Sequence, residues 1–115
     1  MQKTWSFDPH SDGEKITPDI QKMVIERANA YAKKCTWYPK FQLKIHFRGQ
    51  FCYLDASKDS QEPFPMGRLR YCGCDEWSFD FYTYSNERYT PCIFCTGEWC
   101  GSVEEALAKC SMYLQ

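Results

Sequence analysis

The stretch from Arg68 to Tyr84 alternates apolar and polar side chains, and this alternation constrains the fold more than any other feature. The apolar positions are Leu69, Tyr71, Trp77, Phe79 and Phe81, and the polar positions among them are Arg68, Arg70, Ser78, Asp80 and Tyr82. A period of two residues is typical of a strand that buries one face. We therefore expect two antiparallel strands, joined by a turn around Cys72-Gly-Cys74, with one apolar face and one polar face.

A second hairpin is expected over residues 43–56, and its turn predicts its register. Gly49 and Gln50 suit a two-residue type II′ turn, which places Arg48 opposite Phe51. Counting outward then pairs apolar residues on one face and polar residues on the other: Leu43 with Ala56, Ile45 with Leu54, Phe47 with Cys52, His46 with Tyr53, and Lys44 with Asp55 as an ion pair. A shift of one residue would mix the two faces, so the pattern favours this register.

Two helices are expected, one before the strands in the sequence and one after them. Residues 17–19 (Thr-Pro-Asp) form a helix start, and Pro39 is expected to end this helix. Ser102 and Glu105 have the spacing of a capping box at the start of the second helix. The apolar stripes are Ile20, Val24, Ala28, Tyr31 and Cys35 in the first helix, and Val103, Ala106, Leu107, Cys110 and Leu114 in the second.

The chain of 115 residues is long enough for one domain. We expect a flexible N-terminal arm over residues 1–16 and a single α+β domain over residues 17–115. A polar loop is expected over 57–66, and an edge strand, limited by Pro91, over 89–95. The order helix, four or five antiparallel strands, helix predicts a two-layer sandwich with both helices on one face of the sheet. Because 17% of the residues are aromatic, the core should be built around Trp, Tyr and Phe.

The charge and hydropathy patterns limit the classes of partner. The formal net charge is −1, so there is no overall basic field that would attract nucleic acid or an anionic membrane. The polar start lacks the apolar run of a signal peptide, and no segment is apolar enough to span a bilayer. We expect a cytoplasmic protein without membrane association, and therefore reduced cysteines.

The C-terminal cysteines suggest a metal site as an alternative to a purely structural role. Cys72, Cys74, Cys95 and Cys100 would be the ligands of a zinc ion that stabilises the domain. The spacing of the first pair is C-x-C rather than C-x-x-C, and Cys92 and Cys95 would point to opposite faces of a strand. Other cysteines fall on apolar stripes, as small hydrophobic residues do. We therefore expect no cofactor and keep zinc as an alternative.

The polar face of the sheet carries the candidate binding residues, which are Lys44, His46, Tyr53, Arg68, Arg70, Tyr82 and Tyr84. Asp80 is expected to neutralise one arginine and leave the other free. The main hypothesis is a non-enzymatic module that binds a protein partner or forms a homodimer through this face or a sheet edge. The alternative is single-stranded nucleic-acid binding, because basic residues and tyrosines together can bind phosphates and stack bases. No nucleophile–base pair or phosphate-binding loop is recognisable, so an enzyme is not expected.

Two resemblances accompany these patterns. Residues 77–87 (WSFDFYTYSNE), followed by Tyr89, Pro91 and residues 101–107 (GSVEEAL), resemble a family of short uncharacterised bacterial proteins, which implies a bacterial origin. The strand, Gly101 and the Glu-Glu-Ala-Leu sequence are similar to the end of HicB-like antitoxin domains over about twenty residues, which favours a partner-binding role. The helix–strands–helix order also resembles double-stranded RNA-binding domains, but the acidic start of the last helix disfavours phosphate binding there.

Overall fold

The computed structural model describes residues 15–59, 61–74, 76–94 and 96–114, and these form an α+β fold with an antiparallel sheet. The elements are α1 (Pro18–Ala32), β1 (Phe41–Arg48), β2 (Phe51–Lys58), β3 (Phe64–Gly73), β4 (Glu76–Thr83), β5 (Arg88–Cys92), β6 (Cys100–Gly101), α2 (Val103–Cys110) and the 3₁₀ helix η1 (Ser111–Leu114). Strands β1 to β5 are neighbours in chain order, and β6 also pairs with β4. The predicted α+β class with an antiparallel sheet is confirmed, and the sheet has a sixth, short strand, β6, beyond the four or five expected.

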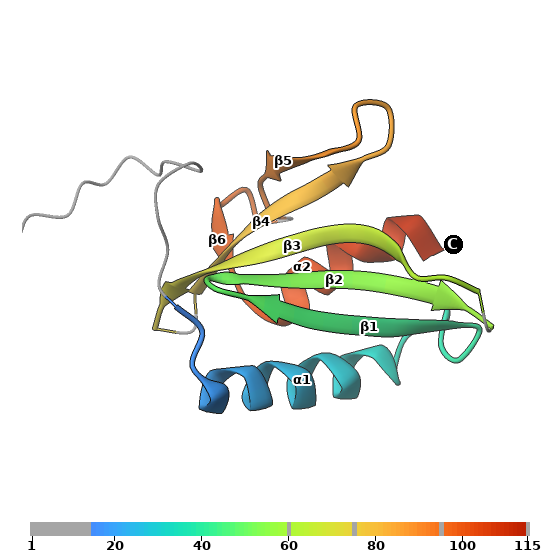
Figure 1. The fold of residues 1–115 in the computed structure, drawn as a ribbon, viewed down its shortest axis with the longest axis horizontal. Coiled ribbons are helices and arrows are strands. Elements are labelled where there is room, and N and C mark those ends of the chain that lie inside the picture. Colours follow the sequence, from blue (N-terminus) through green and yellow to red (C-terminus); the bar gives the residue numbers. More distant parts are fainter. Residues whose placement is uncertain (1–14, 60, 75, 95, 115) are drawn as a thin grey trace, which may run out of the picture.

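The helices and the sheet share one hydrophobic core. Figure 1 shows α2 behind β2 and β3, while α1 runs beside β1. Val24 of α1 and Leu107 of α2 belong to the same buried cluster as Leu54 of β2 and Leu69 of β3. The largest fully buried side chains are Trp77, Phe79 and Phe94, as the aromatic composition predicted.

The hairpin register read from the sequence is confirmed from Leu43↔Ala56 to Arg48↔Phe51. Gly49 has a φ of +62°, a backbone conformation that glycine adopts without steric cost. Lys44 lies opposite Asp55 as predicted, but the ion pair described for Asp55 is with His46. The alternation thus predicts which residues are opposite each other, and the side-chain reach decides which charges meet.

Strands β3 and β4 pair so that their apolar residues lie opposite each other. Leu69 lies opposite Phe79, and Arg68 lies opposite Asp80 on the other face. Gly67 permits close packing, because a Cβ atom at this position would lie 2.7 Å from the Phe79 ring and from the Asp80 carbonyl oxygen. The backbone of β3 therefore lies directly against the aromatic core.

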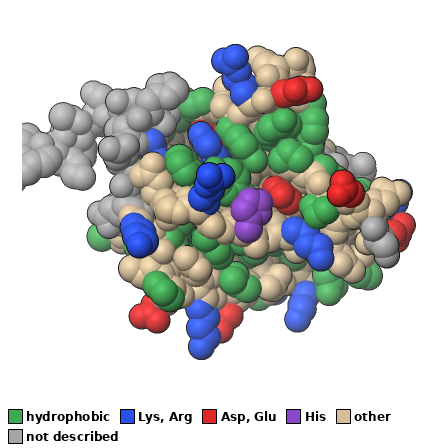
Figure 2. Space-filling view, viewed as in Figure 1, with side chains coloured by type: hydrophobic (Ala, Val, Ile, Leu, Met, Phe, Trp, Pro, Cys, Tyr) green, Lys and Arg blue, Asp and Glu red, His purple; other side chains and the backbone are tan. Residues whose placement is uncertain are grey.

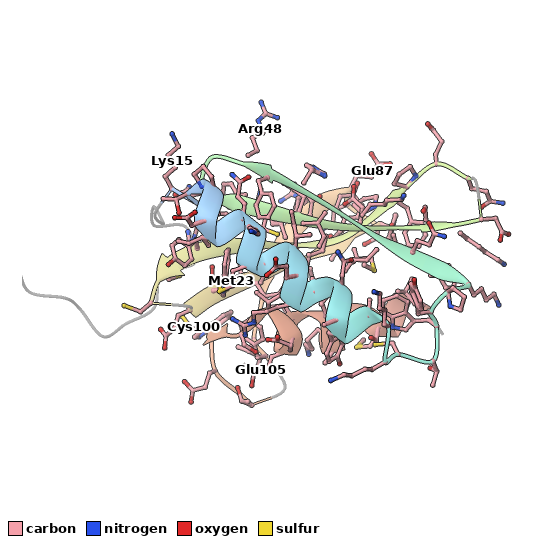
Figure 3. All side chains as sticks on the ribbon, turned by 90° about the horizontal axis from the view of Figure 1, so that it is seen from below. Lys15, Met23, Arg48, Glu87, Cys100 and Glu105 are labelled. Atoms are coloured by element: carbon pink, nitrogen blue, oxygen red, sulfur yellow. The ribbon has the colours of Figure 1, made fainter. Side chains whose placement is uncertain are left out.

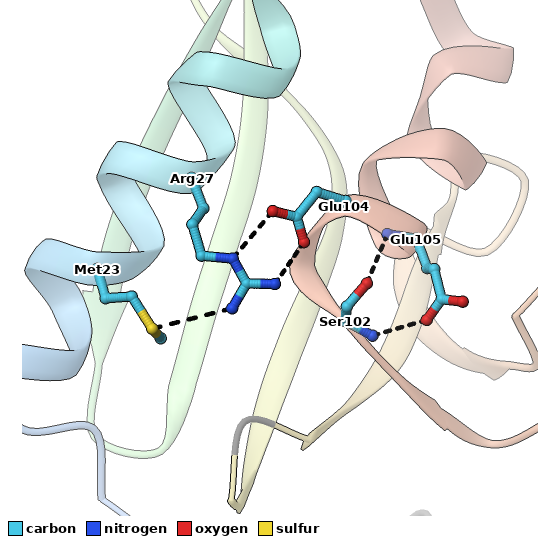
Figure 4. Close-up of polar contacts among 5 residues, drawn as sticks. All are labelled: Met23, Arg27, Ser102, Glu104 and Glu105. Atoms are coloured by element: carbon cyan, nitrogen blue, oxygen red, sulfur yellow. Dashed lines mark hydrogen bonds and ion pairs between the residues drawn. The ribbon is translucent and has the colours of Figure 1, made fainter.

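Both helices begin where their capping residues predicted. The Thr17 hydroxyl accepts a hydrogen bond from the Ile20 N–H, and the Ser102–Glu105 capping box is complete (Figure 4). The first helix ends at Ala32, however, and does not continue toward Pro39. Turns fill the gap, and they bury Trp37, whose indole N–H donates to the Ser111 hydroxyl at 3.0 Å.

Several predicted boundaries were wrong by a few residues. The expected loop over 57–66 is shorter, since β2 continues to Lys58 and β3 begins at Phe64. The strand expected over 89–95 ends at Cys92. Ile16, assigned to the flexible arm, is buried, and its N–H donates to the Gly49 carbonyl. Residues 1–14 lie outside the described part of the chain. Neither described α-helix has the length and apolar character needed to cross a membrane.

Candidate functional site

The polar face is the side of the sheet that points away from the hydrophobic core. One row of residues crosses four strands of this face, from His46 on β1 through Tyr53 and Arg68 to Asp80 on β4. Figure 2 looks onto this side and shows basic side chains and a histidine beside hydrophobic side chains. Figure 3 shows Arg48 pointing away from the molecule on the side opposite Glu105 of α2.

Arg68 lies at the centre of the polar face and is held from three sides. Its Nε donates to Asp80 Oδ2 at 2.8 Å, and its guanidinium lies 4.3 Å from the centre of the Phe51 ring and 4.8 Å from that of Tyr89. Burial opposes the charge of Arg68, but hydrogen bonds and attraction from Asp80 and Tyr53 raise its pKa overall. Arg68 therefore stays charged and fixes the rings around it.

Four tyrosines of the polar face, which we call the tyrosine cluster, contact one another: Tyr53, Tyr82, Tyr84 and Tyr89. Tyr82 contacts Tyr84 and Tyr89 edge to face, with ring centres 4.9 and 5.0 Å apart. Tyr53 and Tyr89 are 5.7 Å apart although they come from β2 and β5, which are separated by about 14 Å in a flat sheet. The two rings therefore lean toward each other across β3 and β4.

Asp55 and His46 form a partly buried ion pair on the polar face. Its Oδ2 lies 3.9 Å from His46 Nδ1, while its Oδ1 is buried without a hydrogen-bond partner in the described structure. Burial raises the pKa of Asp55, and the nearby His46 partly offsets this effect. His46 itself stacks flat on Tyr53, with ring centres 4.8 Å apart. Asp55 Oδ1 is thus shielded from solvent, whereas the His46 imidazole is open to a bound molecule.

The second arginine is not the free group that the sequence predicted. Arg68 has Asp80 as its partner, but Arg70 is only 6% exposed and so is not available at the surface. The Tyr84 hydroxyl, also expected to be free, donates to the Pro65 carbonyl. Of the predicted binding residues, Lys44, His46 and Tyr84 are exposed, and Tyr53, Arg68 and Tyr82 are partly buried.

Tyr89 also belongs to the polar face, although the sequence analysis did not place it there. Burial, followed by the charges of Asp55 and Tyr53, raises the pKa of Tyr89 to about 12, so its hydroxyl remains a donor at neutral pH. Tyr89 lies directly opposite Tyr82. Extending the β4–β5 pairing through the turn at residues 84–87 would have placed Tyr89 on the polar face.

The cysteines do not assemble into the expected zinc site within the described residues. No three His, Cys, Asp or Glu side chains among residues 15–114, apart from the gaps, are grouped so as to hold a metal ion. Cys95 lies outside the described residues, and Cys74 is exposed at the β3–β4 turn. Cys100, rather than Cys95, lies opposite Ser78, and burial, together with the nearby Cys72, raises the pKa of its thiol to about 11.

Comparison of the chain with protein-family models, curated proteins and solved structures found no significant match.

Proposed function

We propose that this protein is a non-enzymatic binding module whose polar face binds a protein partner with acidic side chains. The observation that carries the proposal is the tyrosine cluster, in which every ring remains at least partly exposed although the rings contact one another. Aromatic side chains with few rotamers lose little entropy on binding, and tyrosine is enriched at the centres of protein interfaces. The Arg68 guanidinium lies 4.8 Å from the centre of the Tyr89 ring, and Tyr89 in turn contacts Tyr53 and Tyr82.

The acidic character of the partner follows from the charges beside the tyrosine cluster. Lys44, His46 and Arg48 alternate along β1 as exposed residues, spaced about 6.7 Å apart, and we call them the basic row. A second copy that docked face to face would bring the basic row toward the same charges of its partner. Repulsion between like charges disfavours such a contact, so a different, acidic protein is the better fit.

The buried oxygen of Asp55 is a destabilising feature of the same surface. A buried carboxylate oxygen without a hydrogen-bond partner costs folding free energy, and proteins retain such unfavourable groups mainly at functional sites. Nucleic-acid binding has less support, because Arg68 is engaged by Asp80 and Arg70 is buried.

Site-specific photo-crosslinking in cells that naturally make the protein tests the proposal. A photoreactive residue at His46 should give one discrete protein adduct, whereas the same residue at Met112, which is 60% exposed outside the polar face, should not. The Lys44→Glu/Arg48→Glu double variant should abolish the adduct. The matched Lys33→Glu/Lys34→Glu variant, which reverses two exposed charges after α1, should leave it unchanged.

Three outcomes would contradict the proposal. They are equal adducts from the His46 and Met112 positions, an adduct that contains only a second copy of this chain, and an adduct that is destroyed by nuclease. Light scattering of the purified protein should show a monomer at micromolar concentration.

A further inference from the structure

The sheet has two edges, and β1 forms the one that suits the addition of a further strand. Within the described part of the chain β1 pairs with β2 alone, so its other side has no strand beside it. Its eight residues keep one continuous register with β2 and include no proline. The opposite edge consists of β5 and β6, and Pro91 in β5 lacks the N–H group that a further strand would need. A regular edge strand such as β1 is a template for strand addition.

The turn after β1 determines which of its backbone groups face outward. Arg48 and Phe51 flank this two-residue turn as a hydrogen-bonded pair, and bonded pairs alternate with non-bonded pairs along an antiparallel ladder. Phe41 follows the same alternation, because its N–H donates to the Trp37 carbonyl outside the sheet at 2.8 Å. Three further residues of β1 therefore direct their N–H and C=O groups away from β2: Leu43, Ile45 and Phe47.

The side chains of these three residues form an incomplete rim of the hydrophobic core. Leu43, Ile45 and Phe47 pack against the core but remain partly exposed. Their partners on β2 are 0% exposed, and these partners are Ala56, Leu54 and Cys52. A strand added to β1 would place its own side chains beside the rim and remove more apolar surface from water.

The other face of β1 carries the basic row. Its side chains are about 6.7 Å apart, which is the distance between alternate residues of any extended segment. Like charges on an edge strand repel a second copy of that strand. An extended segment with acidic residues at alternate positions instead matches the basic row in both charge and spacing.

We propose that the acidic partner docks as an extended segment that forms a further strand beside β1. Its acidic side chains lie next to the basic row, and the apolar side chains between them lie next to Leu43, Ile45 and Phe47. The same alternation holds for a parallel and an antiparallel segment, because residues that are neighbours across two strands point to the same face. This docking mode rests on the proposed function, and it adds the conformation and the sequence pattern of the partner.

A synthetic peptide of alternating glutamate and valine tests this docking mode on the unmodified full-length protein. The amides of Leu43, Ile45 and Phe47 should exchange hydrogen rapidly in the free protein. The peptide should slow their exchange at least about tenfold in NMR spectra, because these amides would donate to its carbonyl groups. The amides of β5, at the other edge, should exchange at the same rate with and without the peptide.

Two control peptides separate charge from alternation. Alternating lysine and valine keeps the alternation and reverses the charge, whereas a block of glutamates followed by a block of valines keeps the composition and loses the alternation. Neither peptide should slow exchange at β1. In the Lys44→Glu/Arg48→Glu variant, which changes exposed side chains only, the lysine peptide should slow the exchange and the glutamate peptide should not.

Four results would overturn strand addition at β1. They are slowed exchange at β5 instead, equal slowing by the block peptide, unchanged exchange at the three β1 amides, and slow exchange of these amides before any peptide is added. In the last case another segment of this chain or a second copy already occupies the edge. A discrete adduct at His46 in the crosslinking experiment, together with unchanged β1 amides, would exclude this docking mode and leave the proposed function standing.

Discussion

Arg27 and Glu104 join the first helix to the last through a two-pronged ion pair. Arg27 Nε lies 2.9 Å from Glu104 Oε2, and Nη2 lies 2.5 Å from Oε1 (Figure 4). The two residues are 77 positions apart in the chain. Their side chains are 29% and 35% exposed, so solvent weakens the attraction without removing it.

Replacing Glu104 should reveal the contribution of this pair. The hydrogen bond from Arg27 lowers the pKa of Glu104 below its usual value of 4.5, so the pair stabilises the fold above that pH. Glu104→Gln should lower the free energy of unfolding at pH 7 by about 1 kcal/mol. The difference should disappear as the pH falls through the folded-state pKa. Urea unfolding at pH 7 and pH 3 measures it, with Glu62→Gln, an exposed carboxylate, as control.

Phe79 should be among the most sensitive core positions. It is 1% exposed and packs against Phe94, with ring centres 6.0 Å apart. Phe79→Ala leaves a cavity that neighbouring rings fill only partly, so the free energy of unfolding should fall by about 3–5 kcal/mol. Ile93→Ala, at a position 40% exposed, should change it by no more than about 0.5 kcal/mol. Similar losses from both variants in urea unfolding would show that Phe79 is not a core residue.

A methyl group at Gly67 should also destabilise the protein, by a different mechanism. The new Cβ would lie 2.7 Å from the Phe79 ring and from the Asp80 carbonyl, and neither can move away freely. Gly67→Ala should cost about 1–3 kcal/mol through overpacking. Gly97 has a φ of +89° but open space around it, so Gly97→Ala should cost about 1 kcal/mol through backbone strain alone. Adding Phe79→Leu to Gly67→Ala should recover the part of the lost stability that comes from the ring contact, whereas adding it to Gly97→Ala should recover none.

Asp55→Asn should stabilise the protein at neutral pH, unlike most substitutions. Because the pKa of Asp55 is raised in the folded state, its ionised form opposes folding, and this cost grows as the pH rises above the usual value of 3.8. The asparagine variant should therefore melt at a higher temperature than the unmodified protein at pH 7 and at the same temperature at pH 3. Asp59→Asn, in the exposed turn after β2, is the control. A destabilised Asp55 variant at pH 7 would contradict the burial argument.

The sequence predicted local features well because each depends on neighbouring residues. The β1–β2 register follows from the Gly49 turn and from alternation, and the capping box of α2 follows from Ser102 and Glu105 alone. The predicted end of α1 was wrong because Trp37 packs in the core, where its indole N–H donates a hydrogen bond to the hydroxyl of Ser111, 74 residues away. No local pattern contains that contact.

The candidate site was predicted in composition but not in arrangement. Alternation placed Lys44, His46 and Tyr53 on the polar face, and the pairing of Asp80 with one arginine is confirmed. The burial of Arg70 and the contact of Tyr53 with Tyr89 depend on how the strands twist relative to one another. Twist is a property of the assembled sheet, so reading one strand at a time does not give it.

The contact between α1 and α2 has a consequence for how the protein is made. Val103 and Leu107 complete a core whose other walls are built from residues that leave the ribosome earlier. Until residues 103–114 have emerged, the apolar side of a nascent sheet has no second helix to cover it. During that interval the apolar side chains that pack with Val103 and Leu107 in the finished core are exposed to solvent, and the Arg27–Glu104 ion pair cannot form.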